Sequence, residues 1–353
     1  ARRRRTEQEA ASDEPGTRHD LIRARVAGRS SDGVFKGELR YTVTSTEIEE
    51  KEKYVTEEDG VEVTRIISTG NYLPVTELEA IAGWTVDGRA GRGRLPKATP
   101  MRRLLSSLSI RSDIKLREST TTDDRWGLYR LDPDVIQGDD TIEGDIISRH
   151  SVRYVSPGGG ASARLTIETK DELDRQYENA SERRKVRNAA VDVKLSPAND
   201  VTWRVLGEAG RRERDADGSV ESYRIDERSL QAEVSVRRFG DIELRLSALL
   251  GGEDEELKGT SVRRYEVTPG MTWRFRGRGA MTVSVTRAEV ETDEDDLPLY
   301  LGGGRGPGGT TLWRMSGDYR VNSYLTATLS YTGERREGRE AVQTADLRGS
   351  AYF

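Results

Sequence analysis

The chain has 353 residues, enough for one large β domain or two ordinary domains. Its formal net charge is -5, so the charge balance gives no sign of a nucleic-acid-binding surface. It has no cysteine and only two histidines, which excludes disulfides and cysteine nucleophiles and argues against a histidine-based metal cluster.

Residues 1–105 carry no single clear pattern. The start, ARRRRTEQEAASDEPG, is predicted to be a disordered, solvated terminus, and it contains no apolar core of a signal peptide. Two alternating runs, at residues 35–43 and 61–67, could make one extra up-and-down hairpin, while residues 76–79 could start a short helix. We predict an N-terminal segment at 1–105 that is a plug, a periplasmic part or the end of a larger upstream domain.

From about residue 106 onward, one pattern repeats. Apolar and polar residues alternate for about ten positions, and then a turn or a charged stretch follows. Period two is the strand period, and about ten residues is what a tilted strand needs to cross a bilayer. No apolar run approaches the ~20 residues of a transmembrane helix. We therefore predict an all-β, antiparallel, up-and-down transmembrane β-barrel of about 12–14 strands at residues 106–353.

The connections between these strands alternate between short and long. Short turns are predicted at 156–160, 197–200, 239–241, 277–279 and 320–323, and long charged loops at 170–187, 211–228, 251–259, 291–309 and 332–340. Outer-membrane barrels have short periplasmic turns and long external loops. The rhythm therefore predicts that the short turns and the N-terminal end of the barrel face the periplasm.

No catalytic, cofactor or metal site is predicted. His150 has Ser148 and Ser151 nearby, but neighbours on a strand point to opposite faces, so His150 and Ser151 cannot face each other. We predict a histidine at the rim or in the lumen, and no enzyme. GRGPGG at 304–309 matches a dinucleotide fingerprint by letter, but a strand follows it where a helix is needed. The acidic runs at 253–256 and 291–296 lack EF-hand spacing.

The chain ends on an alternating strand, AVQTADLRGSAYF, whose apolar face carries Leu347, Gly349, Ala351 and Phe353. This ending resembles the C-terminal assembly signal of Gram-negative outer-membrane β-barrel proteins, an amphipathic strand that ends in Phe. The resemblance covers roughly residues 106–353 by pattern and about the last 45 residues by motif. It implies a location in the cell outer membrane. It also implies outer-membrane lipid, lipopolysaccharide and the barrel-assembly machinery as partners, with no nucleic acid.

Charged residues recur on the polar faces of the predicted strands. A charge on the lipid face would cost up to about 2–4 kcal/mol at mid-bilayer, so these side chains should face a lumen. They could close it as a lattice of ion pairs, or they could line a water-filled pore and set its ion selectivity. The predicted lumen residues are Arg164, Glu168, Lys194, Arg204, Glu243, Arg245, Glu266, Arg274, Arg276, Arg314, Asp318, Arg320 and Arg348.

Three functions remain open at this point. The first is a passive, porin-like outer-membrane channel or transport barrel with a charged lumen. The second is a non-conducting barrel that anchors or secretes an upstream surface domain. The third is a soluble all-β binding protein, in which the apolar faces form the core of a sandwich. The sequence leaves the solute and the oligomeric state undetermined.

Overall fold

The structure is a computed structural model. It describes residues 5–6, 19–31, 34–58, 61–88, 107–121, 137–177, 180–216, 221–237, 240–275, 277–294, 297–298, 300–302 and 306–351. No helix in these ranges is long and apolar enough to cross a membrane.

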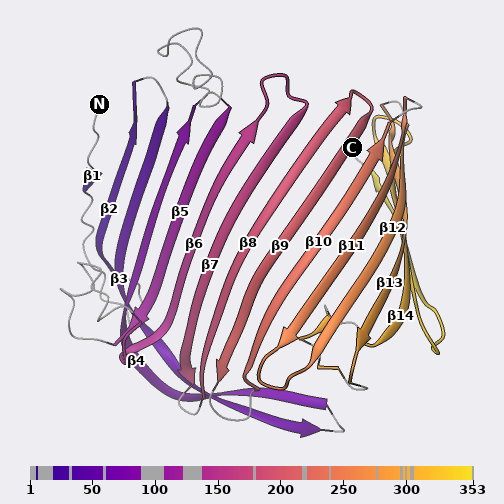
Figure 1. The fold of residues 1–353 in the computed structure, drawn as a ribbon. Coiled ribbons are helices and arrows are strands. Elements are labelled where there is room, and N and C mark those ends of the chain that lie inside the picture. Colours follow the sequence, from indigo (N-terminus) through magenta and orange to yellow (C-terminus); the bar gives the residue numbers. More distant parts are fainter. Residues whose placement is uncertain are drawn as a thin grey trace. The chain divides into compact units, whose positions relative to one another are not determined.

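Sixteen strands form one sheet, in which each strand is followed by its neighbour in chain order (Figure 1). The ladders described between consecutive strands are all antiparallel, which confirms the predicted all-β, up-and-down architecture. The strands are β1 Arg5–Thr6, β2 His19–Arg29, β3 Phe35–Glu58, β4 Val61–Asp87, β5 Leu108–Thr120, β6 Thr141–Val155, β7 Ala161–Tyr177, β8 Ala180–Ala198, β9 Val201–Ala216, β10 Tyr223–Val236, β11 Ile242–Glu255, β12 Ser261–Phe275, β13 Gly279–Thr292, β14 Gly308–Arg320, β15 Leu325–Arg336 and β16 Val342–Ala351.

The chain divides into two compact units. The first comprises Ala1–Tyr154, Leu165–Ala189 and Gly210–Arg224, and the second comprises Val155–Arg164, Ala190–Ala209 and Ile225–Phe353. We use "turn end" for the strand ends joined by the short connections, such as Ser156–Gly160 and Asn199–Asp200, and "loop end" for the opposite ends.

The sheet holds more strands than the 12–14 predicted, because the chain before residue 88 adds to it. β2, β3 and β4 pair with one another, and β4 pairs with β5. The helix predicted at residues 76–79 is wrong. These residues lie in β4 and pair on one side with Ser45–Thr42 of β3 and on the other with Thr120–Arg117 of β5, so two ladders satisfy their backbone. The predicted domain boundary at residue 105 lies outside the described residues.

The long charged loops are shorter than predicted, because strands continue into them. The segment at 170–187 belongs mostly to β7 and β8, and that at 211–228 mostly to β9 and β10. β11 and β15 likewise extend to Glu255 and Arg336. Charged side chains occupy both faces of these extensions, so the alternation that marks a strand with one polar face is lost there.

One face of the sheet is apolar and uncovered. In the second unit, Trp203 and Leu250 each keep 54% of their surface exposed, and Leu347 keeps 75%. In the first unit, Phe35 and Leu39 are 46% and 47% exposed. Within the described ranges there is a single sheet and no helix to cover this face. The sandwich alternative is therefore wrong, because its apolar faces would be buried against a second layer.

The apolar band crosses the strands of the second unit obliquely. Tyr265 of β12 pairs with Leu250 on one side but with Glu289 on the other, and the band of β13 begins only at Val285. In β15 the apolar band begins still nearer the turn end, at Tyr331, which pairs with Met315 of β14. A band of constant height shifts in register from strand to strand when the strands are tilted, as in transmembrane barrels.

Aromatic side chains mark both edges of this band. Near the turn end the rings of Trp273 and Phe275 have centroids 4.9 Å apart, and those of Phe275 and Tyr319 are 5.8 Å apart. Nearer the loop end lie Tyr265 and Trp313. This is the distribution expected of two interfacial girdles, although the aromatic residues are few.

Candidate functional site

The polar face of the sheet is built by the residues between the apolar ones. In β11, Glu243 and Arg245 alternate with Leu244 and Leu246. The ladder places Glu243 opposite Thr272 of β12 and Arg245 opposite Gly270, so the polar residues of neighbouring strands share one face. We take this face as the candidate functional site.

Glu243 is the centre of the best-connected cluster on the polar face. Its carboxylate accepts hydrogen bonds from the guanidinium groups of Arg274 at 2.9 Å, Arg237 at 3.1 Å and Arg245 at 3.3 Å. The Glu243 side chain is only 12% exposed, whereas the three arginines are 45–55% exposed. The acid is thus enclosed by cations that themselves reach water.

A second set of ion pairs lies beside this cluster. Arg204 of β9 donates from Nε to Asp192 of β8 at 2.8 Å and from Nη2 at 3.0 Å, in the bidentate geometry that makes such pairs strong. The Arg245 Nε atom also lies 3.7 Å from Glu233 of β10. Neighbouring strands are therefore tied together across the polar face by side chains as well as by the backbone ladder.

These clusters line one cavity of about 510 Å³ on the polar face. Its charged residues are four acids and four bases, so at neutral pH their formal charges cancel. The lining residues are Asp192, Lys194, Asn199, Asp200, Thr202, Arg204, Glu233, Ser235, Arg237, Glu243 and Arg245.

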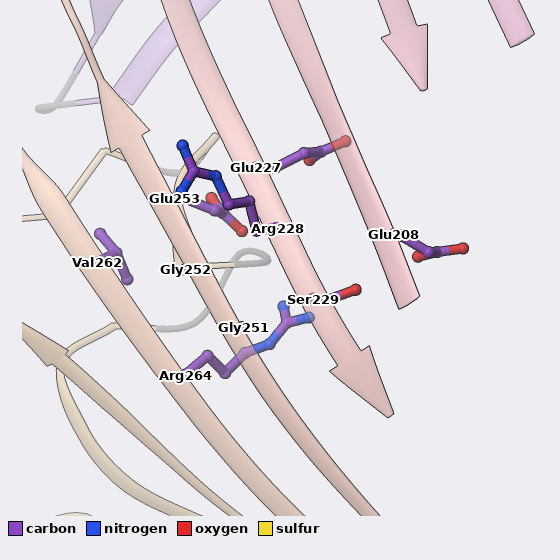
Figure 2. A pocket seen from close by; sticks show the side chains of 9 residues that line it. All are labelled: Glu208, Glu227, Arg228, Ser229, Gly251, Gly252, Glu253, Val262 and Arg264. Atoms are coloured by element: carbon purple, nitrogen blue, oxygen red, sulfur yellow. The ribbon is translucent and has the colours of Figure 1, made fainter. Parts of the chain in front are cut away.

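A smaller cavity of about 120 Å³ lies toward the loop end and is more acidic (Figure 2). Glu208, Glu227 and Glu253 line it, together with Arg228 and Arg264. In Figure 2 the side chain of Arg264 extends across the strand at Gly251, its partner in the ladder. The polar face therefore changes from acidic near the loop end to balanced near the turn end.

Part of the connection between β13 and β14 folds onto the polar face. Leu301 is fully buried, and the neighbouring Gly302 backbone N–H donates to Glu253 at 3.1 Å. A side chain at Gly302 would meet Leu297, Val290 and Val262, so the segment is packed closely against the sheet. Residues 297–298 and 300–302 thus cover part of the polar face at the loop end.

The other predicted lumen residues are more scattered. Arg149 pairs with Glu168 at 2.8 Å, Arg264 with Glu266 at 3.5 Å, and Arg348 with Asp346 at 2.6 Å. Arg164 is exposed in β7. Within the described ranges, Arg314, Asp318 and Arg320 of β14 are exposed and have no ion-pair partner. Arg276 lies outside the described residues.

Sequence reasoning missed several partners in these clusters. Asp192 and Glu233 alternate with apolar residues in their own strands, so the period-two rule would have placed both on the polar face. Arg237 follows the last residue of β10, where no alternation remains to reveal it.

His150 is not on the polar face, so the predicted position in the lumen is wrong. It pairs in the ladder with Ser112 and lies on the apolar face between Ile146 and Val152 in period-two order. The hydroxyl of Ser112 is 2.8 Å from His150 Nδ1. Among the described residues, no group of three or more His, Asp or Glu side chains could hold a metal ion.

The last strand continues the apolar face as predicted by the alternation. Leu347 pairs with Leu329, Gly349 with Ala327, and Ala351 with Leu325. Phe353 lies outside the described residues. Recognition of this strand by an assembly machinery stays a prediction.

No protein-family model matches the sequence, and no curated protein matches it. Solved structures do match. The FrpB iron transporter of Neisseria meningitidis has 10% identity and a TM-score of 0.45 over 89% of this chain and 59% of that one. The alcaligin outer-membrane receptor FauA of Bordetella pertussis has 9% identity and a TM-score of 0.49 over 95% and 63%. OmpT, an outer-membrane protein of Vibrio cholerae, has 10% identity and a TM-score of 0.35 over 92% and 98%.

The chain spans between about half and two thirds of the length of the iron transporter and receptors that it matches. At these identities and TM-scores the matches carry no argument about ligand or mechanism. The antiparallel up-and-down sheet, its uncovered apolar face and its oblique apolar band are observed in this chain itself. The fold is an antiparallel, up-and-down sheet of the kind that outer-membrane β-barrel proteins have. This agrees with the resemblance seen in the C-terminal strand, which implies the cell outer membrane as the location.

Proposed function

We propose that the end strands of the sheet pair to close the barrel, that its polar face lines a water-filled lumen, and that the protein is a passive outer-membrane channel. The observation that supports this proposal is that arginine side chains engaged in ion pairs on the polar face remain accessible to solvent. Arg237, Arg245 and Arg274 all contact Glu243, yet about half of each side chain remains accessible. A dry lattice that filled the lumen would bury both partners of each pair.

The balance of charge gives the proposed channel its selectivity. The cavity near the turn end has equal numbers of acids and bases and favours neither sign of ion. The cavity near the loop end has one more acid than bases, since Glu208, Glu227 and Glu253 stand against Arg228 and Arg264, and it weakly attracts cations to that mouth. We therefore expect weak cation selectivity that falls as salt screens the acidic side chains.

Conductance in planar bilayers tests the proposal. The purified chain should open steps of current that persist without added ligand. A chain that inserts, shows heat-modifiable migration on gels and stays silent would contradict a channel and favour the second function, an anchor for an upstream domain. The observation that favours this second function is that residues 300–302 cover part of the polar face.

A further inference from the structure

The apolar face carries a groove near the turn end of β12–β16. It has a volume of about 360 Å³ and a nearly apolar lining that includes Phe275, Met281, Tyr319, Leu329 and Leu347. Its floor is backbone, because a side chain at Gly317 would lie 3.1 Å from the carbonyl oxygen of Ala280. Large side chains therefore surround a strip of small residues, and the groove is a depression in the apolar face.

One cation stands at the rim of this groove. Arg278, in the turn between β12 and β13, donates from Nη1 to the hydroxyl of Tyr319 at 3.0 Å. Within the described part of the chain, Tyr319 is its only side-chain partner, whereas Arg237, Arg245 and Arg274 on the polar face all pair with Glu243. A guanidinium has five N–H donors, so most of those of Arg278 remain available for an anion.

We propose that this groove and Arg278 form a binding site for a glycerophospholipid. One acyl chain lies in the groove, and the phosphate accepts hydrogen bonds from Arg278 at the level where the apolar band ends. The occupant follows from charge and shape together: the groove takes an apolar chain, and the cation at its rim takes a compact anion. Tyr319 joins the two parts, since its ring lines the groove and its hydroxyl holds Arg278.

The site needs a membrane-embedded apolar face but no open lumen. A silent barrel would end the channel proposal without affecting this one.

Native mass spectrometry of the full chain in detergent, titrated with dioleoyl phosphatidylglycerol, tests the site. We expect one tightly retained lipid per chain. Arg278→Gln, which removes the cation, and Ala327→Leu, which fills the groove beside Tyr319, should each weaken retention by roughly three- to tenfold. Arg278→Lys should keep part of the affinity. Arg339→Gln, which removes an exposed arginine from a loop-end turn, is the matched control and should bind as the unmodified chain does.

Two further probes separate the phosphate from the chain. Dioleoylglycerol, which lacks the phosphate, should bind more weakly, and glycerol 3-phosphate should not compete. Equal binding by Arg278→Gln, Ala327→Leu and the unmodified chain would overturn the proposal, as would effective competition by glycerol 3-phosphate. Chains that pair through this face and exclude lipid would also overturn it, since the occupant would then be a second copy. Heat-modifiable migration of each variant shows that it has folded.

Discussion

Gly279 shows how one residue fixes a hairpin at the scale of single atoms. Its φ is +141°, a conformation that residues with a side chain rarely adopt, and a Cβ there would overlap the carbonyl oxygen of Asp318 in β14. β13 can therefore approach β14 at this point only because the side chain is missing.

Gly279→Ala should accordingly destabilise the protein strongly. Backbone strain alone costs about 1–3 kcal/mol, and the overlap with Asp318 adds to it. The urea midpoint of the refolded protein in detergent measures the loss. Gly28→Ala is the control, because a Cβ at Gly28 has no atom within 4 Å, and its midpoint should stay close to that of the unmodified chain. Similar midpoints for both variants would show that the turn is not as tight as described.

In the electrostatics of the polar face, Glu243 is the single residue on which several ion pairs depend. Glu243→Gln removes the one carboxylate that three arginines share. The proposed channel should then become more anion-selective, with the cation-to-anion permeability ratio falling by roughly two- to fivefold. The reversal potential in a salt gradient measures this ratio. Glu289→Gln on the opposite face is the control and should leave it unchanged; an equal shift in both variants would place Glu243 outside the permeation path.

At the scale of elements, the segment at 300–302 is the feature with the clearest consequence for conduction. Leu301 is buried against the polar face, so Leu301→Asp should release the segment and increase the conductance of each open step. Leu257→Asp is the matched control, since Leu257 is 57% exposed in a neighbouring turn. Unchanged conductance in Leu301→Asp would mean that the segment does not narrow the path of ions.

The strands were predictable wherever their two faces meet different surroundings. Leu244 and Leu246 alternate with Glu243 and Arg245, and this contrast located β11 without a structure. The extensions of β7 and β8 beyond residue 170 were not found, because charged residues on both faces erase the contrast. The run at 76–79 looked helical by composition, but two flanking strands decided its conformation.

The sequence predicted which residues lie on the polar face, but not which of them contact one another. Alternation placed Arg204, Glu243 and Arg274 on the polar side. Which acid meets which base depends on the register between strands, and Glu243 and Arg274 are 31 residues apart in the chain. Period two carries no information about register, so pairs such as Arg204 with Asp192 emerged only from the structure.

At the scale of the whole molecule, one physical contrast explains most of the architecture. A chain with 34% charged residues and a mean hydropathy of -0.74 would ordinarily be read as soluble, yet its sheet leaves a continuous apolar face uncovered. Half of the residues in each strand suffice for that face, so the average hydropathy stays low. The account therefore depends on the claim that this face meets the hydrocarbon of a bilayer.

Spin labels placed one at a time along β11 test this claim most directly, and the absence of cysteine makes such single-site labelling straightforward. In lipid vesicles, labels at Leu244, Leu246 and Leu250 should collide mainly with oxygen, which concentrates in hydrocarbon. Labels at Glu243 and Arg245 should collide mainly with a water-soluble nickel complex. Collision rates without this period of two, or labels on the apolar positions that neither reagent reaches, would contradict a face in contact with lipid.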